Sequence, residues 1–204
     1  MSSRDAPPPG LWRGVVVAII LVLGVGVALW TAIRCGWNAP RPTRPPDWQV
    51  AEPVVLQVSS PEQQALELLG DPVEAFTAET VATPRAGSSF NAYGLAFRAQ
   101  SPERYAVFAV GSDGYLAVLV YDGQRETPCL DWRPFPHVRQ GEASNRLRLA
   151  CAAGECHFWV NDEHVASLPD EFGPRGRVGV WAGRRTDAVL EVAFDGMSVW
   201  EGRP

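Results

Sequence analysis

Hydrophobic and polar residues divide the chain into three unlike stretches. Residues 1–13 are short and polar, and residues 14–33 are twenty residues without a charge. A helix of that length spans about 30 Å, the thickness of the hydrocarbon core of a bilayer. From residue 48 onward, short apolar runs alternate with turn residues. We therefore predict a short tail over 1–13, one transmembrane helix over 14–34, a stalk over 35–47 and a folded domain over 48–204.

Two other interpretations of the apolar run are a cleaved signal peptide and a buried core helix. A signal peptide has an apolar region of about 7–15 residues and small residues at its cleavage site, whereas Arg34 stands directly before Cys35. The same arginine argues against a lipoprotein signal at Cys35. The run is also long and uniformly apolar for a core helix. The sequence thus favours an uncleaved single-pass anchor in a cell membrane.

Basic residues lie near both ends of this run, so the positive-inside rule is nearly balanced. The small N-terminal segment and the large C-terminal part favour a domain outside the cytoplasm. Residues 35–47 are rich in proline. Proline-rich linkers are extended and semi-rigid, at about 3.1 Å per residue, so this stretch is expected to hold the domain away from the membrane.

Residues 48–204 carry the pattern of an all-β domain. Short β-favouring runs are separated by turn residues every 8–12 residues, as in sandwiches and barrels. Residues 61–69 can form a helix, because Ser60 offers a cap and good helix formers follow, or equally a strand and turn. The predicted strands are Pro53–Val58, Ala75–Ala82, Tyr93–Ala99, Tyr105–Val110, Tyr115–Tyr121, Asn145–Cys151, Cys156–Val160, Glu163–Ser167, Arg177–Ala182 and Val189–Trp200.

Turn residues and alternation fix several of these strands. Asp113-Gly114 and Asn161-Asp162 mark hairpin turns. Leu147 and Leu149 alternate with Arg146 and Arg148, so the leucines are expected to face the core and the arginines water. On the next strand, Phe158 and Val160 are expected to face inward, and His157 and Trp159 outward.

The cysteines give a clue to the redox compartment. If the turn between two strands is the two-residue loop Ala153-Gly154, Cys151 lies opposite Cys156 with Cα atoms about 4.5 Å apart, within disulfide reach. A three-residue loop would place the two cysteines on opposite faces. A shared core face for the flanking leucines and phenylalanine favours the first register, but a disulfide and two reduced, buried cysteines both remain open. A disulfide would favour an extracytoplasmic domain and leave Cys129 unpaired.

An ordered series of short motifs resembles a known superfamily. The series is Asn91–Arg98, Tyr105–Phe108, Ser112–Tyr115, Gly141-x-x-x-Asn145-x-Leu147, Phe158–Asn161, Gly176–Val180 and Val192–Asp195. It is similar to bacterial extracellular modules of the concanavalin A-like lectin/glucanase superfamily, including laminin-G-like modules and 3-keto-disaccharide hydrolase-like domains. The resemblance covers about residues 50–201. It implies a jelly-roll sandwich of two antiparallel sheets.

Catalytic residues are not evident in the sequence. Glycoside hydrolysis normally needs two carboxylates beside one bond, and the Glu-x-Asp-x-x-Glu strand of the related glucanases is absent. His157 and His164 lie on neighbouring strands and can be close, but we interpret them as surface histidines. Cys151, Cys156 and His157 do not have the paired spacing of a zinc site. We therefore predict no catalytic residues, no metal and no cofactor.

A binding role needs aromatic platforms with polar side chains beside them. Each aromatic candidate can equally be a packing residue. Arg98 stands in a β-run opposite Leu95 and Phe97, where it can be solvated or can pair with an acidic residue. The candidate ligand-binding residues are Tyr93, Arg98, Tyr105, Tyr115, Trp132, Arg139, Trp159 and Trp181.

Charge excludes some partners. The net charge of −5 divides into +3 for residues 1–47 and −8 for residues 48–204. An acidic domain is a poor binder of nucleic acid and of an anionic membrane surface. The expected function is a membrane-anchored, non-catalytic module that binds a glycan or a cell-surface protein. The alternatives are a glycoside-processing enzyme of the 3-keto-disaccharide hydrolase type and a structural or sensor domain without a ligand.

Overall fold

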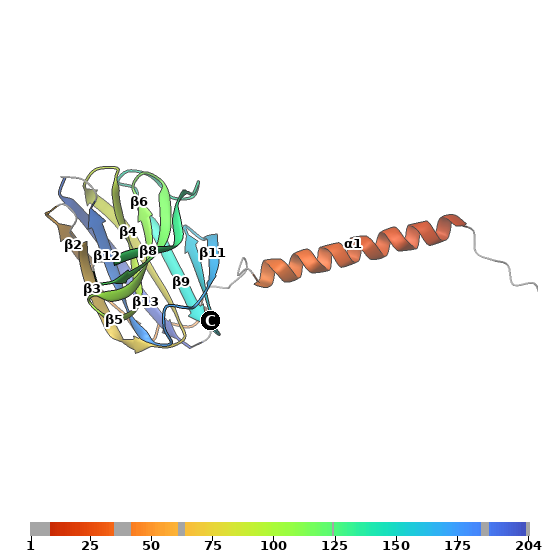
Figure 1. Cartoon of the computed structure of the whole chain (residues 1–204), viewed down its shortest axis with the longest axis horizontal. Coiled ribbons are helices and arrows are strands. Elements are labelled where there is room, and N and C mark those ends of the chain that lie inside the picture. Colours follow the sequence, from red (N-terminus) through yellow and green to blue (C-terminus); the bar gives the residue numbers. More distant parts are fainter. Residues whose placement is uncertain (1–8, 35–41, 61–63, 124, 185–187, 203–204) are drawn as a thin grey trace, which may run out of the picture. The chain divides into compact units, whose positions relative to one another are not determined.

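The computed structural model describes residues 9–34, 42–60, 64–123, 125–184 and 188–202. The chain forms two compact units, Met1–Ala39 and Pro40–Pro204. The described part of the first unit is one helix, α1 (Pro9–Arg34), and the described strands all belong to the second (Figure 1).

Helix α1 has 26 residues and contains the predicted transmembrane run. Among the described residues, however, no helix is long and apolar enough to cross a membrane. The predicted transmembrane helix is therefore not supported by the structure.

The second unit contains thirteen strands within its described residues. Ten of them match the predicted strands, with bounds that differ by a few residues. In chain order they are β1 (Trp48–Gln49), β2 (Val54–Val58), β3 (Gln64–Val73), β4 (Phe76–Ala86), β5 (Asn91–Ser101), β6 (Arg104–Gly111), β7 (Tyr115–Asp122), β8 (Arg125–Pro134), β9 (Asn145–Ala152), β10 (Glu155–Val160), β11 (Glu163–Pro169), β12 (Gly176–Arg184) and β13 (Leu190–Glu201).

The strands form two antiparallel sheets that pack as a β-sandwich (Figure 1). Sheet A has the order β1-β13-β4-β9-β10-β11, and β2 also pairs with β13. Sheet B has the order β3-β12-β5-β6-β7-β8. The prediction of an all-β sandwich with two antiparallel sheets is confirmed.

Alternating apolar side chains from both sheets fill the core between them. Leu147, Leu149 and Phe158 from sheet A are fully buried there, as predicted. Phe158 contacts Phe108 of sheet B with ring centroids 5.1 Å apart. The expectation that Arg148 faces water is wrong, because only 6% of this residue is exposed. Its guanidinium lies 4.3 Å from the ring centroid of Trp159, so the aromatic ring and not water covers it.

Three strands lie outside the ten predicted ones: β1, β3 and β8. For residues 61–69 the sequence left a helix or a strand and turn open, and the described part of this stretch lies in the edge strand β3, paired with β12; residues 61–63 lie outside the described residues. The pairing with β12 outweighs the helix propensity of these residues. Strand β8 was missed because it is polar, contains Pro128 and is mostly exposed, which is typical of an edge strand.

The β9–β10 hairpin has the first of the two registers considered. Cys151 is paired with Cys156 and Ala152 with Glu155. Ala153 and Gly154 both have positive φ, 54° and 82°, as in the two-residue turn that matches strand twist. The two cysteines form a disulfide with Cα atoms 4.1 Å apart. Of the two states that the sequence left open, a disulfide and two reduced cysteines, the structure shows the disulfide.

Candidate functional site

A pocket of about 140 Å³ lies at one end of sheet B. Asn91 begins β5, Tyr115 begins β7, and Trp132 lies in the edge strand β8. The turn between β6 and β7 adds Asp113, and Phe90 directly precedes β5. Three aromatic side chains therefore surround an amide and a carboxylate.

Backbone hydrogen bonds hold the polar side chains of this pocket. Asp113 Oδ1 accepts a hydrogen bond of 3.1 Å from the Tyr115 amide, and Asn91 Oδ1 accepts one of 3.2 Å from the Ser112 amide. A Cβ at Gly111 would lie 2.3 Å from Asp113 Oδ1, so the glycine leaves room for the carboxylate in this position. The turn therefore fixes the acid beside the aromatic rings.

Exposure shows which side chains of the pocket can meet a ligand. Phe90 is 63% and Tyr115 40% exposed, whereas Asn91 is buried at 7%. A pocket with apolar walls and a few fixed polar groups is the usual form of a small-molecule site. Aromatic rings can cover the apolar face of a sugar, and the carboxylate and amide can bind its hydroxyl groups.

Two of the eight predicted ligand residues, Tyr115 and Trp132, line this pocket. Tyr93 instead faces the core, fully buried, and its hydroxyl accepts a hydrogen bond of 3.0 Å from Asn145. Burial raises the pKa of Tyr93 to about 12. Arg139 is exposed, and its guanidinium donates to the backbone oxygen of Ser144.

Tyr105 and Trp181 lie on the outer face of sheet B. Both donate hydrogen bonds of 2.8 Å to Gln64 Oε1, and Tyr105 stacks on Tyr121 with ring centroids 4.9 Å apart. Both are almost fully buried, and burial raises the pKa of Tyr105 to about 12. Trp159 is buried on the outer face of sheet A. None of these three rings lines the aromatic pocket, which is formed by Phe90, Asn91, Asp113, Tyr115 and Trp132.

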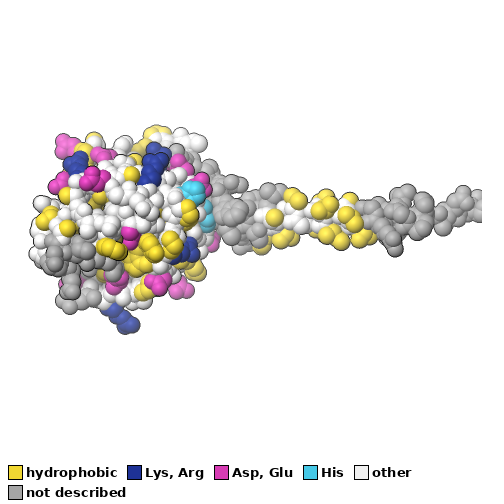
Figure 2. Space-filling view, turned by 90° about the horizontal axis from the view of Figure 1, so that it is seen from above, with side chains coloured by type: hydrophobic (Ala, Val, Ile, Leu, Met, Phe, Trp, Pro, Cys, Tyr) yellow, Lys and Arg dark blue, Asp and Glu magenta, His cyan; other side chains and the backbone are white. Residues whose placement is uncertain are grey.

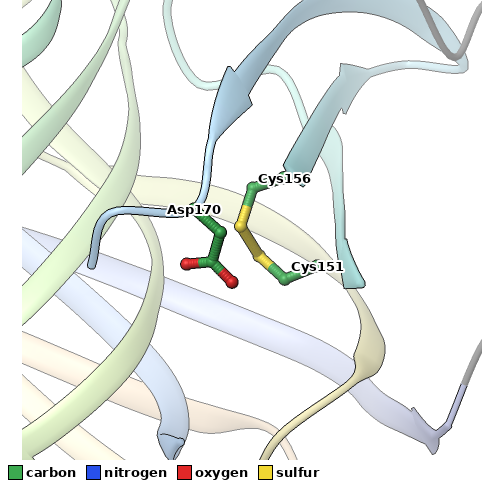
Figure 3. A group of neighbouring side chains, drawn as sticks. All are labelled: Cys151, Cys156 and Asp170. Carbon is green, nitrogen blue, oxygen red and sulfur yellow. A yellow bond between two sulfur atoms is a disulfide. The ribbon is translucent and has the colours of Figure 1, made fainter. Parts of the chain in front are cut away.

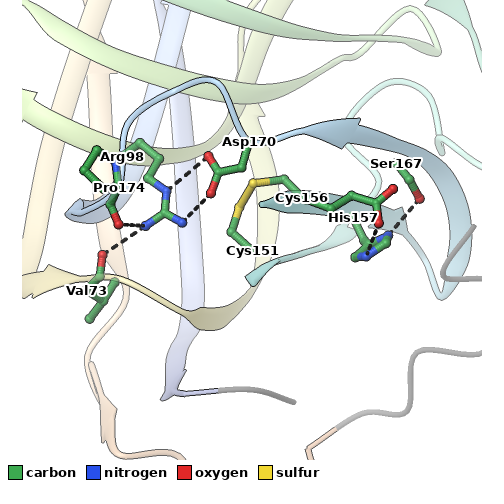
Figure 4. The surroundings of a disulfide bond; sticks show 9 residues. Val73, Arg98, Cys151, Cys156, His157, Ser167, Asp170 and Pro174 are labelled. Atoms are coloured by element: carbon green, nitrogen blue, oxygen red, sulfur yellow. Dashed lines mark hydrogen bonds and ion pairs between the residues drawn. A yellow bond between two sulfur atoms is a disulfide. The ribbon is translucent and has the colours of Figure 1, made fainter. Parts of the chain in front are cut away.

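Arg98 is paired with an acid, one of its two expected arrangements. It is 3% exposed and makes an ion pair of 2.5 Å with Asp170, whose side chain is 7% exposed. Its guanidinium also donates to the backbone oxygens of Val73 and Pro174, as Figure 4 shows. The Arg98 guanidinium thus donates four hydrogen bonds, two to Asp170 and one each to Val73 and Pro174, and so links three separate segments of the sandwich.

Asp170 also lies beside the disulfide (Figure 3). Its carboxylate and the two sulfur atoms are within 4.8 Å of one another, a spacing that can hold a metal ion. The sulfur atoms are already bonded to each other, and both carboxylate oxygens accept hydrogen bonds from Arg98. These three residues therefore do not fit a metal site in this form of the protein.

A larger groove of about 490 Å³ opens beside the edge strand β8. It is lined by Val120, Asp122, Arg125, Thr127, Cys129, Leu168, Pro169, Glu171 and Phe172. Cys129 is the free, exposed cysteine of the described residues, as the sequence predicts once Cys151 and Cys156 are joined. Partial burial and the charge of Glu171 raise the pKa of the Cys129 thiol.

Sequence reasoning missed three residues of the aromatic pocket. Asp113 was interpreted as a turn residue, which it is, but the turn also directs it into the pocket. Asn91 begins a strand and Phe90 precedes it, so neither carried a signal of its own. An exposed phenylalanine next to a strand end is the one feature that could have pointed to Phe90.

Comparisons with known proteins identify the fold. No protein-family model matches the chain, and no curated protein matches it. Among solved structures, the carbohydrate binding module CBM66 from Bacillus subtilis is similar, with a TM-score of 0.59 and 16% identity over 72% of this chain and 86% of that one. A functionally unknown protein from Saccharomyces cerevisiae has a TM-score of 0.57 and 17% identity, over 78% of this chain and 94% of that protein's chain. A Bacillus subtilis protein of unknown function with a galectin-like fold has a TM-score of 0.54 and 11% identity over 74% and 83%. The β-sandwich of this chain is thus similar in fold to these three proteins.

Proposed function

We propose that the second unit is a glycan-binding module whose binding site is the aromatic pocket of Phe90, Asn91, Asp113, Tyr115 and Trp132. The observation that carries this proposal is the combination of two exposed aromatic rings with a carboxylate and an amide held by the backbone. The likeness in fold to a carbohydrate binding module adds support.

The size of the pocket limits what it can take. Ligand sites for drug-sized molecules measure about 300–1,000 Å³, and this pocket measures about 140 Å³. Such a pocket takes one sugar unit, with the remainder of a glycan in solvent. A terminal or branching sugar is therefore the proposed ligand class.

Calorimetric titration of the full chain against a panel of mono- and oligosaccharides tests this function. We expect one site per chain for at least one sugar. Phe90→Ala and Asp113→Asn should each weaken binding at least tenfold. Val55→Ala is the matched control, because Val55 is 45% exposed and lies in β2 outside the pocket. No heat with any sugar, or equal loss in the control, would contradict the proposal.

The same samples address the alternative of a glycoside-processing enzyme. After incubation, each sugar of the panel is analysed for cleavage products by mass spectrometry. Unchanged sugars are the result expected of a binding module. A product formed by the full chain and lost in Asp122→Asn or Glu171→Gln would instead assign catalysis to the groove that holds these two acids.

We also propose that the domain works outside the cytoplasm. The Cys151–Cys156 disulfide supports this location, because structural disulfides persist in oxidising compartments. Both cysteines are fully buried, so source cells are denatured in the alkylating agent without a reductant, and mass spectrometry of the protein tests this location. Both cysteines should resist alkylation until a reductant is added, and immediate alkylation of both would contradict the proposed location. An anchor at residues 14–34 stays a prediction from the sequence.

A further inference from the structure

The outer face of sheet A carries a cluster that the glycan site does not use. His157 lies on β10 and His164 on β11, and Ser167 of β11 is the cross-strand partner of His157. Ser167 Oγ is 2.7 Å from His157 Nδ1 and 3.1 Å from His164 Nε2. Two imidazole nitrogens therefore converge on one hydroxyl group, and the contact of His157 with Ser167 is drawn in Figure 4.

A β-bulge brings this cluster together. Residues three apart in a regular strand point to opposite faces, so His164 and Ser167 should not meet. In β11, however, His164 pairs with Trp159 and Ala166 with Phe158, and the register shifts between these two pairs. The extra residue, Val165, turns into the core. The bulge thus places His164 and Ser167 on the same face as His157.

The groups behind the two rings favour lone pairs on the converging nitrogens. Glu155 Oε2 lies 3.6 Å from His157 Nε2, which favours the ring proton on Nε2 and leaves the lone pair on Nδ1. His164 makes a hydrogen bond with the backbone of Ala166, in which a ring N–H donates to the carbonyl oxygen. Metal-ligating histidines have this same outer support, from a carboxylate or the backbone.

With lone pairs on both converging nitrogens, the hydroxyl group between the rings can serve only one of them. A hydroxyl carries one proton and can donate to only one of two nitrogen lone pairs. Burial lowers the pKa of His164 to about 4 and also lowers the pKa of His157. The neutral form of imidazole is the one that binds a metal ion.

We propose that His157 Nδ1 and His164 Nε2 bind one divalent transition-metal ion of the zinc type, which takes the position of the Ser167 hydroxyl once that side chain turns to another χ1 rotamer. Bonds of about 2.0–2.1 Å to the ion require each nitrogen to approach that position by no more than about 1 Å. His157 is 20% exposed, so water can complete the coordination. Histidine side chains reach the visible surface of the sandwich in Figure 2.

The donor atoms decide the kind of ion. Imidazole nitrogen suits zinc, copper and nickel, whereas magnesium and calcium require oxygen ligands. Trp159 packs against both rings, with centroid distances of 5.9 Å to His157 and 5.8 Å to His164. This packing limits ring rotation and keeps the two nitrogens close together, which favours binding of a single ion.

Calorimetric titration of the full chain with zinc chloride tests the site, in a Cys35→Ser, Cys129→Ser background so that free thiols do not bind the ion. One zinc per chain is expected, with no heat from calcium chloride. His157→Ala and His164→Ala should each weaken zinc binding at least tenfold. His137→Ala is the matched control, since His137 is exposed and outside the cluster, and it should leave binding unchanged.

A second measurement needs no substitution in the cluster and so does not depend on how the variants fold. In ¹⁵N spectra of the imidazole rings, zinc should shift the signals of His157 Nδ1 and His164 Nε2 and leave those of His137 in place. No zinc binding, or binding that shifts only His137, would overturn the proposal. The titration contains no glycan, so its result is independent of the proposed glycan site.

Discussion

Arg98 ties together segments that are far apart in the sequence. Its backbone has a positive φ of 52°, a conformation that costs a non-glycine residue about 1–2 kcal/mol. The side chain offsets this cost through Asp170 and the carbonyl groups of Val73 and Pro174, and its guanidinium lies 5.3 Å from the ring centroid of Phe76. The residue is thus fixed from its backbone to its charged end.

Removing the charge of Asp170 should destabilise the folded chain, because Arg98 is buried and then lacks its acidic partner. We expect Asp170→Asn to lower the free energy of unfolding by about 3–5 kcal/mol, because one partner of a buried ion pair is then left unpaired. Denaturant unfolding of the full chain measures the change. Glu171→Gln is the control, since Glu171 is exposed. Equal stability of the two variants would contradict this assignment of Arg98.

The thiol of Cys129 should react slowly. Its pKa is raised by burial and by the charge of Glu171, so less of it is thiolate at a given pH, and the thiolate is the reactive form. We expect alkylation by iodoacetamide at pH 8 to be several-fold slower in the native chain than in the denatured chain. The pH midpoint of the reaction should lie higher in the native chain and move down in Glu171→Gln. Identical midpoints in native and denatured chains would disprove the raised pKa.

At the scale of elements, the turn of the β9–β10 hairpin contains a residue whose replacement should stabilise the protein. Ala153 is exposed and has a φ of 54°, and asparagine tolerates this left-handed conformation better than alanine. Ala153→Asn should therefore raise the free energy of unfolding by about 0.5–1 kcal/mol, measured by denaturant unfolding. Ala152→Asn, in the adjoining strand end, should bring no such gain. Equal effects at both positions would argue against the turn as the cause.

Pairing in the folded sheet decides what the sequence missed or left open. Strand β8 is polar and contains Pro128, because an edge strand needs neither an apolar face nor every backbone hydrogen bond. Strand β3, where the sequence allowed a helix or a strand, is held by its pairing with β12. The bulge at Val165 breaks the alternation of β11, and only the pairing of the folded sheet reveals it. Strands with two well-marked turns, such as β9 and β10, were predicted almost to the residue.

At the scale of the whole molecule, residues 48–204 carry a net charge of −8. Figure 2 shows acidic side chains on several parts of the visible face, and no basic face for nucleic acid was expected from the sequence. The aromatic pocket lies at one end of sheet B, and the histidine cluster lies on the outer face of sheet A. The two proposed sites can therefore be tested one at a time.

The candidate site was less predictable than the fold. Tyr115 and Trp132 could be named from the sequence as aromatic candidates, but their grouping depends on the strand order β5-β6-β7-β8. Tyr93 and Trp181 looked equivalent to them in sequence, and burial separates them. A period of two assigns a face to each side chain, but it does not say which part of that face neighbouring side chains leave open.

Indole N–H signals of the full chain offer the most direct test of glycan binding. Trp132 lines the pocket, and Trp159 lies on the other sheet as an internal reference. With a panel of mono- and oligosaccharides, at least one sugar should shift the Trp132 signal saturably and leave the Trp159 signal in place. A panel in which no sugar moves Trp132, or in which binding moves Trp159 instead, would contradict a glycan site in this pocket.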